Sequence, residues 1–234
     1  MRYWLVMPAA GSSSRFGAQT PKQYAALEGR TVIEWALAPF LGDARCAGAV
    51  VALAAQDRRW PKVAARLGGA QVSVARGGAE RSASVRSALA ALSARAEPCD
   101  WVLVHDAARP CLSGEDLDRL LTRLDGHPVG GLLATPAADT LKRAQGGQGE
   151  GFEVAETVDR TSLWRALTPQ MFRYARLCAA LDAAHAAGRL PSDEAQALEW
   201  VGEHPQLVAG NPGNLKITTA AELTLAAALL RART

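Results

Sequence analysis

A loop of small side chains that also carries two cations follows the first apolar run of the chain. Residues 8–24 read PAAGSSSRFGAQTPKQY and come directly after the run 3–7, which has the composition of a buried strand. Arg15 and Lys22 would place positive charge beside a backbone whose free N–H groups could hold a polyphosphate. The loop therefore predicts a nucleoside triphosphate site, with a Gly/Ser surface turn as the plainer alternative. The small residues that would let phosphates approach the backbone are Ala9, Ala10, Gly11 and Ser12.

The spacing of the glycines in this loop excludes two common nucleotide-binding motifs. The chain has no G-x-x-x-x-G-K-[ST] pattern here, so the loop is not a Walker loop. Gly11 and Gly17 also do not form G-x-G-x-x-G, and a dinucleotide-binding fold is therefore not supported.

A second group of polar residues follows the apolar run 101–104. The hexapeptide 105–110 reads HDAARP and puts Asp106 and Arg109 at the end of a predicted strand. Asp106 could accept hydrogen bonds from substrate hydroxyls or help to hold a magnesium ion, and Arg109 could bind a phosphate with its fork of N–H groups. The alternative is an Asp–Arg pair that only closes the strand end, and spacing alone does not decide between the two.

A third candidate is the segment 77–85, which reads GGAERSASV. Turn glycines precede a predicted helix whose first turn carries hydroxyl groups, so Ser82 or Ser84 could simply cap that helix.

Strands and helices alternate along the chain, and this pattern must position the polar residues. Alternation predicts an α/β fold in one domain, residues 1–234, with a mostly parallel sheet covered by helices on both faces. Ligands in such sheets lie at the carboxyl ends of the strands. The expected strands cover 50–53, 72–74, 101–104, 129–133 and 207–208, and the expected helices cover 31–41, 82–96, 117–124, 172–187 and 223–230. Ser113 and Thr219 are the expected caps of two of these helices.

One segment interrupts the alternation. Residues 144–151 read AQGGQGEG and lie between two stretches, 140–143 and 152–158, that could each form a short strand. A protruding β-hairpin arm over about 137–160 is expected from this arrangement. For the tip itself, an irregular surface loop is an equal alternative.

Composition excludes several classes of function. The formal net charge of +3 and the pI of 8.8 are too mildly basic to predict a nucleic-acid groove. The four cysteines show no C-x-x-C spacing and no short metal pattern with the four histidines, so we expect reduced thiols in a cytoplasmic protein. The run 3–7 is too short for a signal peptide or a membrane span, and no membrane association is expected.

Taken together, the three segments resemble the polyol-phosphate cytidylyltransferase family. HDAARP and the PKQY ending of the first loop are the most specific parts of this resemblance. It covers nearly the whole chain, and it implies a Rossmann-like nucleotidyltransferase fold. Further matches, each weak alone, lie at 139–143, 157–160, 167–170, 192–195 and 214–218.

The resemblance implies a reaction and a set of residue roles. CMP would pass from CTP to methylerythritol phosphate, with release of pyrophosphate, in isoprenoid precursor synthesis. The implied catalytic residues are Arg15, Lys22, Arg160 and Lys216. The implied nucleotide-binding residues are Ala9, Ala10, Gly11, Ser12, Gly78 and Ser84, and the implied acceptor-binding residues are Asp106, Arg109, Thr140, Thr168 and Ser192. This chain departs from the family pattern at Ala79, where an acidic residue is expected, and at Ser192, where a threonine is expected.

The resemblance also implies a cofactor and a partner. Mg²⁺ would be bound mainly through the CTP phosphates, with Asp106 as a possible protein ligand. The enzyme would be a homodimer in which the arm, with Thr140 and Arg160, completes the site of the neighbouring subunit. Two other functions stay open: a cytidylyltransferase that uses ribitol 5-phosphate, and a non-catalytic module that binds CTP on the same fold.

Overall fold

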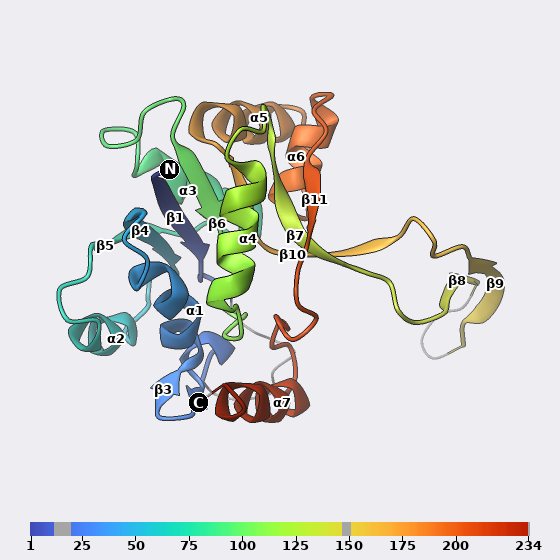
Figure 1. The fold of residues 1–234 in the computed structure, drawn as a ribbon, viewed down its shortest axis with the longest axis horizontal. Helices are drawn as coiled ribbons and strands as arrows, with labels where there is room; N and C mark the ends of the chain where they lie inside the picture. The colour runs from blue at the N-terminus through green and yellow to red at the C-terminus, as the bar shows by residue number, and fades with distance from the viewer. Residues whose placement is uncertain (12–19, 147–150, 234) are drawn as a thin grey trace.

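A seven-stranded sheet organises the protein (Figure 1). The computed structural model describes residues 1–11, 20–146 and 151–233. The strand order across the sheet is β11-β7-β10-β6-β1-β4-β5. In chain order the strands are β1 Tyr3–Pro8, β4 Cys46–Leu53, β5 Val72–Arg76, β6 Trp101–Val104, β7 Gly130–Pro136, β10 Trp164–Arg173 and β11 Gln206–Ala209.

The sheet is mostly parallel, as the sequence predicts. The central strand β1 pairs in parallel with both β4 and β6, so that Leu5 lies between Ala49 and Leu103. The exception is β10, which runs antiparallel to β6 and to β7. Because β1, β4, β5 and β6 run in the same direction, their carboxyl ends meet at one edge of the sheet.

Helices cover both faces of the sheet, and alternate residues of β1 belong to different cores. Leu5 and Met7 pack with α1, α2 and α4 on one face. Trp4 and Val6 pack with α3, α5 and α6 on the other. This alternation follows from the two-residue repeat of a strand. The helices are α1 Val32–Leu41, α2 Trp60–Arg66, α3 Arg81–Ala90, α4 Gly114–Leu124, α5 Tyr174–Ala186, α6 Glu194–Trp200 and α7 Ala220–Arg231.

A smaller third core lies beyond the edge of the sheet where the parallel strands end. The short helix η2 (Lys22–Tyr24) and the strand pair β2 (Ala26–Leu27) and β3 (Arg30–Thr31) lead into α1. The helix α7 packs there through Ala226 and Leu230, against Leu27 and Ile217. Figure 1 shows α7 beyond the carboxyl end of β1.

The structure confirms the two predicted caps and corrects two predicted helices. Ser113 Oγ accepts a hydrogen bond from the Asp116 amide, and Thr219 forms a capping box with Glu222. The helix expected over 82–96 ends at Ala90 and continues only as turns. Phe172, expected at the start of a helix, instead belongs to β10, where it pairs with Val102 of β6. Its ring is buried in the core between the sheet and α5, and this burial favours the strand.

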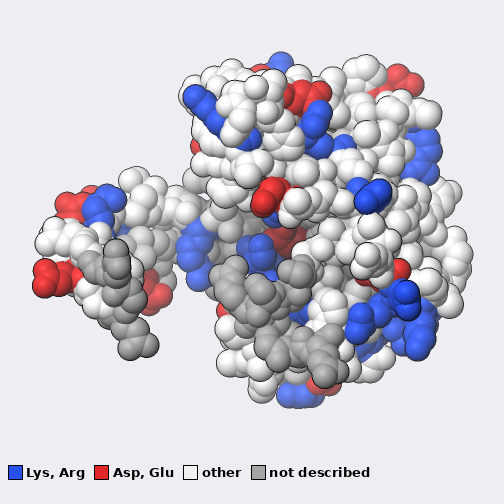
Figure 2. Space-filling view, turned by 180° about the vertical axis from the view of Figure 1, so that it is seen from behind, with Lys and Arg blue, Asp and Glu red and all other residues white. Residues whose placement is uncertain are grey.

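A two-stranded antiparallel ladder stands out from the body of the molecule (Figures 1 and 2). It consists of β8 Leu141–Gln145 and β9 Glu153–Val158, with Leu141 opposite Val158. Phe152 and Val154 are more than half exposed there. Residues 147–150 of the predicted tip lie outside the described part of the chain. Among the described residues, we find no helix with the length and apolarity needed to cross a membrane.

We expect Leu5→Ala to lower the free energy of unfolding by about 3 kcal/mol, because the side chain is fully buried at the centre of the sheet. Urea denaturation measures this change. Leu225→Ala is the control: Leu225 is 53% exposed on α7, and its loss should change stability by less than about 0.5 kcal/mol. Equal effects of the two substitutions would contradict the placement of β1 in the core.

Candidate active site

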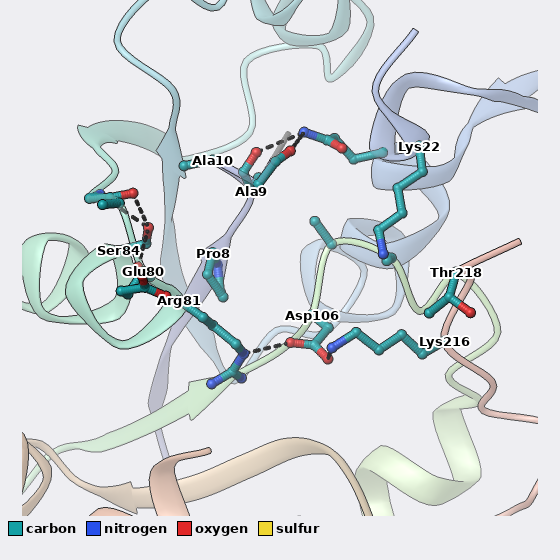
Figure 3. A pocket seen from close by; sticks show the side chains of 16 residues that line it. Pro8, Ala9, Ala10, Lys22, Glu80, Arg81, Ser84, Asp106, Lys216 and Thr218 are labelled. Atoms are coloured by element: carbon teal, nitrogen blue, oxygen red, sulfur yellow. Dashed lines mark hydrogen bonds and ion pairs between the residues drawn. The ribbon is translucent and has the colours of Figure 1, made fainter. Parts of the chain in front are cut away.

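A pocket of about 260 Å³ opens at the edge of the sheet where the parallel strands end (Figure 3). It is lined by the loop after β1, the turn before α3, the residues after β6 and the segment before α7. This is the edge at which ligands of α/β sheets are expected. Ala9, Ala10, Gly11, Lys22, Gly78, Ser84, Asp106 and Lys216 are the predicted site residues that line it.

The first wall of the pocket is the start of the small-residue loop. The Ala9 amide donates to Ala52 O, and the buried Gln23 side chain donates to Ala9 O at 2.8 Å. Gln23 therefore ties the loop to η2, and with it Lys22, whose side chain points into the pocket in Figure 3. Ser12 and Arg15 lie outside the described residues.

The second wall is the turn 77–80, and its glycines are required by close packing. A Cβ atom on Gly77 would lie 2.3 Å from the Ala10 Cβ, and one on Gly78 would lie 2.5 Å from the Ala83 Cβ. Ser84 Oγ accepts from the Gly78 amide at 3.1 Å and donates to Glu80 O at 3.2 Å. The hydroxyl of Ser84 thus shapes the turn from within the pocket lining.

The floor of the pocket is the Asp106 carboxylate, which three cations surround. Its Oδ1 accepts from Arg81 Nε at 3.0 Å, and its Oδ2 lies 2.9 Å from Lys216 Nζ and 3.5 Å from Arg109 Nε. Burial by itself would raise the pKa of Asp106, but Arg81, Lys216 and Arg109 outweigh it and hold the pKa below its ordinary value. Asp106 is therefore an anion at neutral pH.

Sequence reasoning missed the contribution of Arg81. Besides its bond to Asp106, its guanidinium forms two parallel bonds with Glu194, at 2.6 and 3.0 Å. Burial raises the pKa of the Glu194 carboxyl, and the Arg81 charge opposes that rise. Both residues stood within matched motifs, but a contact between positions this far apart in the chain leaves no local signal.

A buried hydrogen-bond chain lies behind Asp106. The Asp106 amide donates to Thr168 Oγ1 at 3.1 Å, and this oxygen lies 2.9 Å from His105 Nδ1. His105 Nε2 faces Arg109 O at 3.1 Å, so it must carry the proton, and the Thr168 hydroxyl then donates to Nδ1. Arg109 Nη1 donates to Asn214 O at 2.7 Å. Arg109 and Thr168, both predicted to bind the acceptor, thus contact Asp106 itself, and neither belongs to the pocket lining.

Three predicted site residues lie away from this pocket within one chain. Thr140 and Arg160 are exposed at the base of the arm, where Arg160 donates to Ala138 O. Ser192 is also exposed, and its hydroxyl bonds to Gln196 Oε1 at 3.0 Å. None of the three contributes to the lining of the pocket.

The described residues offer no preformed metal centre. Within residues 1–11, 20–146 and 151–233 there is no group of three or more His, Cys, Asp or Glu side chains placed to hold an ion. A Mg²⁺ ion needs few protein ligands when substrate phosphates supply the rest. Asp106 is a carboxylate of the pocket, but it already contacts Arg81, Lys216 and Arg109, so substrate phosphates would have to supply most of the ligands.

Comparison with known proteins decides the family. The sequence model of the 2-C-methyl-D-erythritol 4-phosphate cytidylyltransferase family matches residues 3–232. The chain belongs to this family. It is 54% identical to the 2-C-methyl-D-erythritol 4-phosphate cytidylyltransferase of Halorhodospira halophila, over 99% of this chain and 95% of that protein. It is 49% identical to the protein of the same name from Pseudomonas fluorescens SBW25, over 94% of this chain and 92% of that protein.

Solved structures of this cytidylyltransferase family share the fold. A crystal structure of 4-diphosphocytidyl-2C-methyl-D-erythritol synthase superposes with a TM-score of 0.84 at 37% identity, and 98% of each chain is covered. The 2-C-methyl-D-erythritol 4-phosphate cytidylyltransferase from Thermus thermophilus superposes with a TM-score of 0.79 at 34% identity, over 99% of this chain and all of that one. The α/β fold predicted from the sequence is therefore confirmed.

The neutral His105 predicts a loss of stability in acid. Burial lowers its pKa to about 4 from an ordinary value near 6.5, so the unfolded state binds the proton more tightly than the folded state. The stabilisation is complete above about pH 6.5 and is lost as the pH falls toward 4. Between pH 7.5 and pH 5, this one group should lower the free energy of unfolding by about 2 kcal/mol.

Urea denaturation of the wild type and of His105→Asn at these two pH values measures the difference. The variant should lose about 2 kcal/mol less than the wild type over this pH step, because it lacks the buried imidazole. His204→Asn removes an exposed histidine and should keep the wild-type dependence. Parallel pH profiles for wild type and His105→Asn would rule out a neutral, buried His105.

Proposed function

We propose that the protein transfers CMP from CTP to 2-C-methyl-D-erythritol 4-phosphate, releasing pyrophosphate, as a step in isoprenoid precursor synthesis. The observation that carries the proposal is the pocket itself, in a chain that matches the family over residues 3–232. The small-residue loop, Lys22, Lys216 and the Asp106 carboxylate all line this pocket. The names of the relatives specify the same acceptor.

The chemistry needs charge to be balanced rather than a covalent intermediate. A phosphate oxygen of the acceptor attacks the α-phosphorus of CTP, the new P–O bond forms in line with the breaking one, and pyrophosphate leaves. Both reactants are anions, so positive charge must bring them together and stabilise the transition state. No general base is required, because the attacking phosphate is already ionised at neutral pH.

Two lysines of the pocket suit this task. Lys22 and Lys216 come from opposite ends of the chain, and Figure 3 shows both side chains extending into the same space. Lys216 is held at 2.9 Å by Asp106, which fixes its ammonium group before substrate binds. We assign Lys22 to the leaving phosphates and Lys216 to the α-phosphate, with Arg15 as a further cation of the loop.

Base and acceptor would occupy different walls of the pocket. The backbone around Gly78, shaped by Ser84, suits recognition of the cytosine edge, and Ala79 offers only a methyl group there. The Asp106 carboxylate suits acceptor hydroxyls, which donate hydrogen bonds. Mg²⁺ carried by the triphosphate, with Asp106 as its candidate protein ligand, would neutralise phosphate charge.

We also propose a two-fold homodimer in which each arm completes the other subunit's site. Arg160 and Thr140 lie outside the pocket of their own chain, and the ladder exposes Phe152 and Val154 to solvent. Exposed apolar side chains on a thin projection favour burial against a partner.

In this arrangement residues 1–234 form one catalytic domain, with the arm at about 137–160. The proposed nucleotide substrate and the free cysteines of the protein suit a cytoplasmic location.

Pyrophosphate release with CTP and magnesium tests the function directly. Methylerythritol phosphate and ribitol 5-phosphate are offered in parallel, because the choice between them depends on a few hydroxyl and methyl contacts, and one methyl group changes binding by only about 1–3 kcal/mol. We expect release with methylerythritol phosphate. Release only with ribitol phosphate would identify a different acceptor, and CTP binding without any release would identify a binding module.

We expect Lys22→Ala to lower kcat about 100-fold or more with the fold intact, because a preorganised cation contributes on the order of 3 kcal/mol to such a barrier. Steady-state pyrophosphate release measures the effect, and circular dichroism checks the fold. Lys62→Ala, which removes an exposed lysine of α2, should leave kcat unchanged. Near-normal turnover of Lys22→Ala would remove this residue from the mechanism.

Arg160→Lys should raise the acceptor KM while the CTP KM stays unchanged, since lysine keeps the charge but loses the bidentate fork. Initial rates at varied acceptor concentration measure it. The matched control is Arg143→Lys, in the same arm, where Arg143 pairs with Glu156. An acceptor KM that does not move would exclude Arg160 as the phosphate contact.

A further inference from the structure

One guanidinium in the pocket bridges two buried carboxylates. Glu194, only 1% exposed, receives two parallel bonds from Arg81 Nη1 and Nη2, at 2.6 and 3.0 Å. The remaining Nε of Arg81 donates to Asp106 Oδ1 at 3.0 Å. Because the Arg81 group is planar, fixing two of its nitrogens on Glu194 also fixes the direction of the third.

This arrangement is poorly explained by stability alone. A buried ion pair loses much of its attraction to the cost of desolvating both charges. In addition, Arg81 is the first residue of α3, where its charge opposes the helix dipole and the N-cap residue Glu80 offsets part of that cost. Stability therefore gives little reason for this guanidinium to lie at the pocket.

The contacts of Arg81 argue against a direct phosphate contact. Three of its five N–H groups are already engaged by Glu194 and Asp106, and only 24% of its side chain is exposed. Lys216, by contrast, is 40% exposed at its side chain and faces one carboxylate. Phosphates are thus better served by the lysines, while Arg81 acts on Asp106.

The consequence is a carboxylate held from both sides. Arg81 engages Oδ1 and Lys216 engages Oδ2 of Asp106, so rotation of the carboxylate would break one contact or the other. Oδ1 keeps a further lone pair, whereas Oδ2 also faces Arg109 Nε at 3.5 Å, and Asp106 lines the pocket. A hydroxyl donor in the pocket would therefore meet Oδ1 in a fixed orientation.

We propose that Arg81, anchored by Glu194, is a positioning residue that orients Asp106 toward the hydroxyl groups of the acceptor. The inference rests on the proposed function and deepens it. It separates the roles within the pocket: the lysines bind phosphate charge, and the Glu194–Arg81–Asp106 series selects the polyol. Glu194 does not contact the acceptor; it acts through Arg81 and then Asp106.

Kinetics of Arg81→Lys and Glu194→Gln test the proposal. Lysine keeps the charge but cannot bridge two carboxylates, and glutamine keeps the shape of Glu194 without its charge. Both variants should raise the acceptor KM about tenfold or more and leave the CTP KM within about twofold, because misplacing a positioned group costs rate and binding for its own ligand. Arg86→Lys, an exposed arginine of the same helix paired with Asp182, should match the wild type.

Three results would overturn the proposal. An equal rise of both KM values, with a lower melting temperature, would assign Arg81 a structural role. A rise confined to CTP would make it a nucleotide contact. A crystal structure of Arg81→Gln provides a test independent of activity: we expect a rotated Asp106 carboxylate, and an unchanged one would refute the positioning role even if the acceptor were a different polyol phosphate.

Discussion

The structure of the pocket depends on one constraint, which is that a carboxylate must remain charged where little water reaches it. Asp106 follows a buried strand and is only 6% exposed. An isolated carboxylate in that place would take up a proton. The contacts with Arg81, Lys216 and Arg109 prevent this. Arg81 begins α3, Arg109 follows β6, and Lys216 precedes α7, so the charged carboxylate brings three segments of the chain together.

The same constraint explains why the core behind the pocket is polar. His105, Thr168 and Asn214 are buried, and their hydrogen bonds connect the end of β6 with β10 and with the segment before α7. A buried polar network of this kind has a defined geometry, because each donor must find its acceptor. Substrate-facing groups are thereby placed on a rigid support rather than on free loops.

Sequence reasoning could predict the framework because burial leaves a local record. Continuous apolar runs such as 101–104 identify strands buried on both faces, and Ser113 and Thr219 identify helix starts. The antiparallel strand β10 could not be predicted in this way, because its Thr168-Pro169-Gln170 segment is polar and its register shifts there. The Arg81–Glu194 pair could not be predicted either, since it joins residues 113 positions apart.

The antiparallel course of β10 has a consequence for how this protein can change in length. The chain leaves the sheet after β7, forms the arm, and returns along β10 with Trp164 opposite Pro136. The ladder of β8 and β9 in this excursion is separate from the seven-stranded sheet, so a change of length there does not shift the register of β10. On the return strand, a one-residue insertion between Trp164 and Thr168 would turn alternate side chains to the opposite face. The base of the arm is thus tied to the pairing register of the sheet, whereas its distal ladder is not.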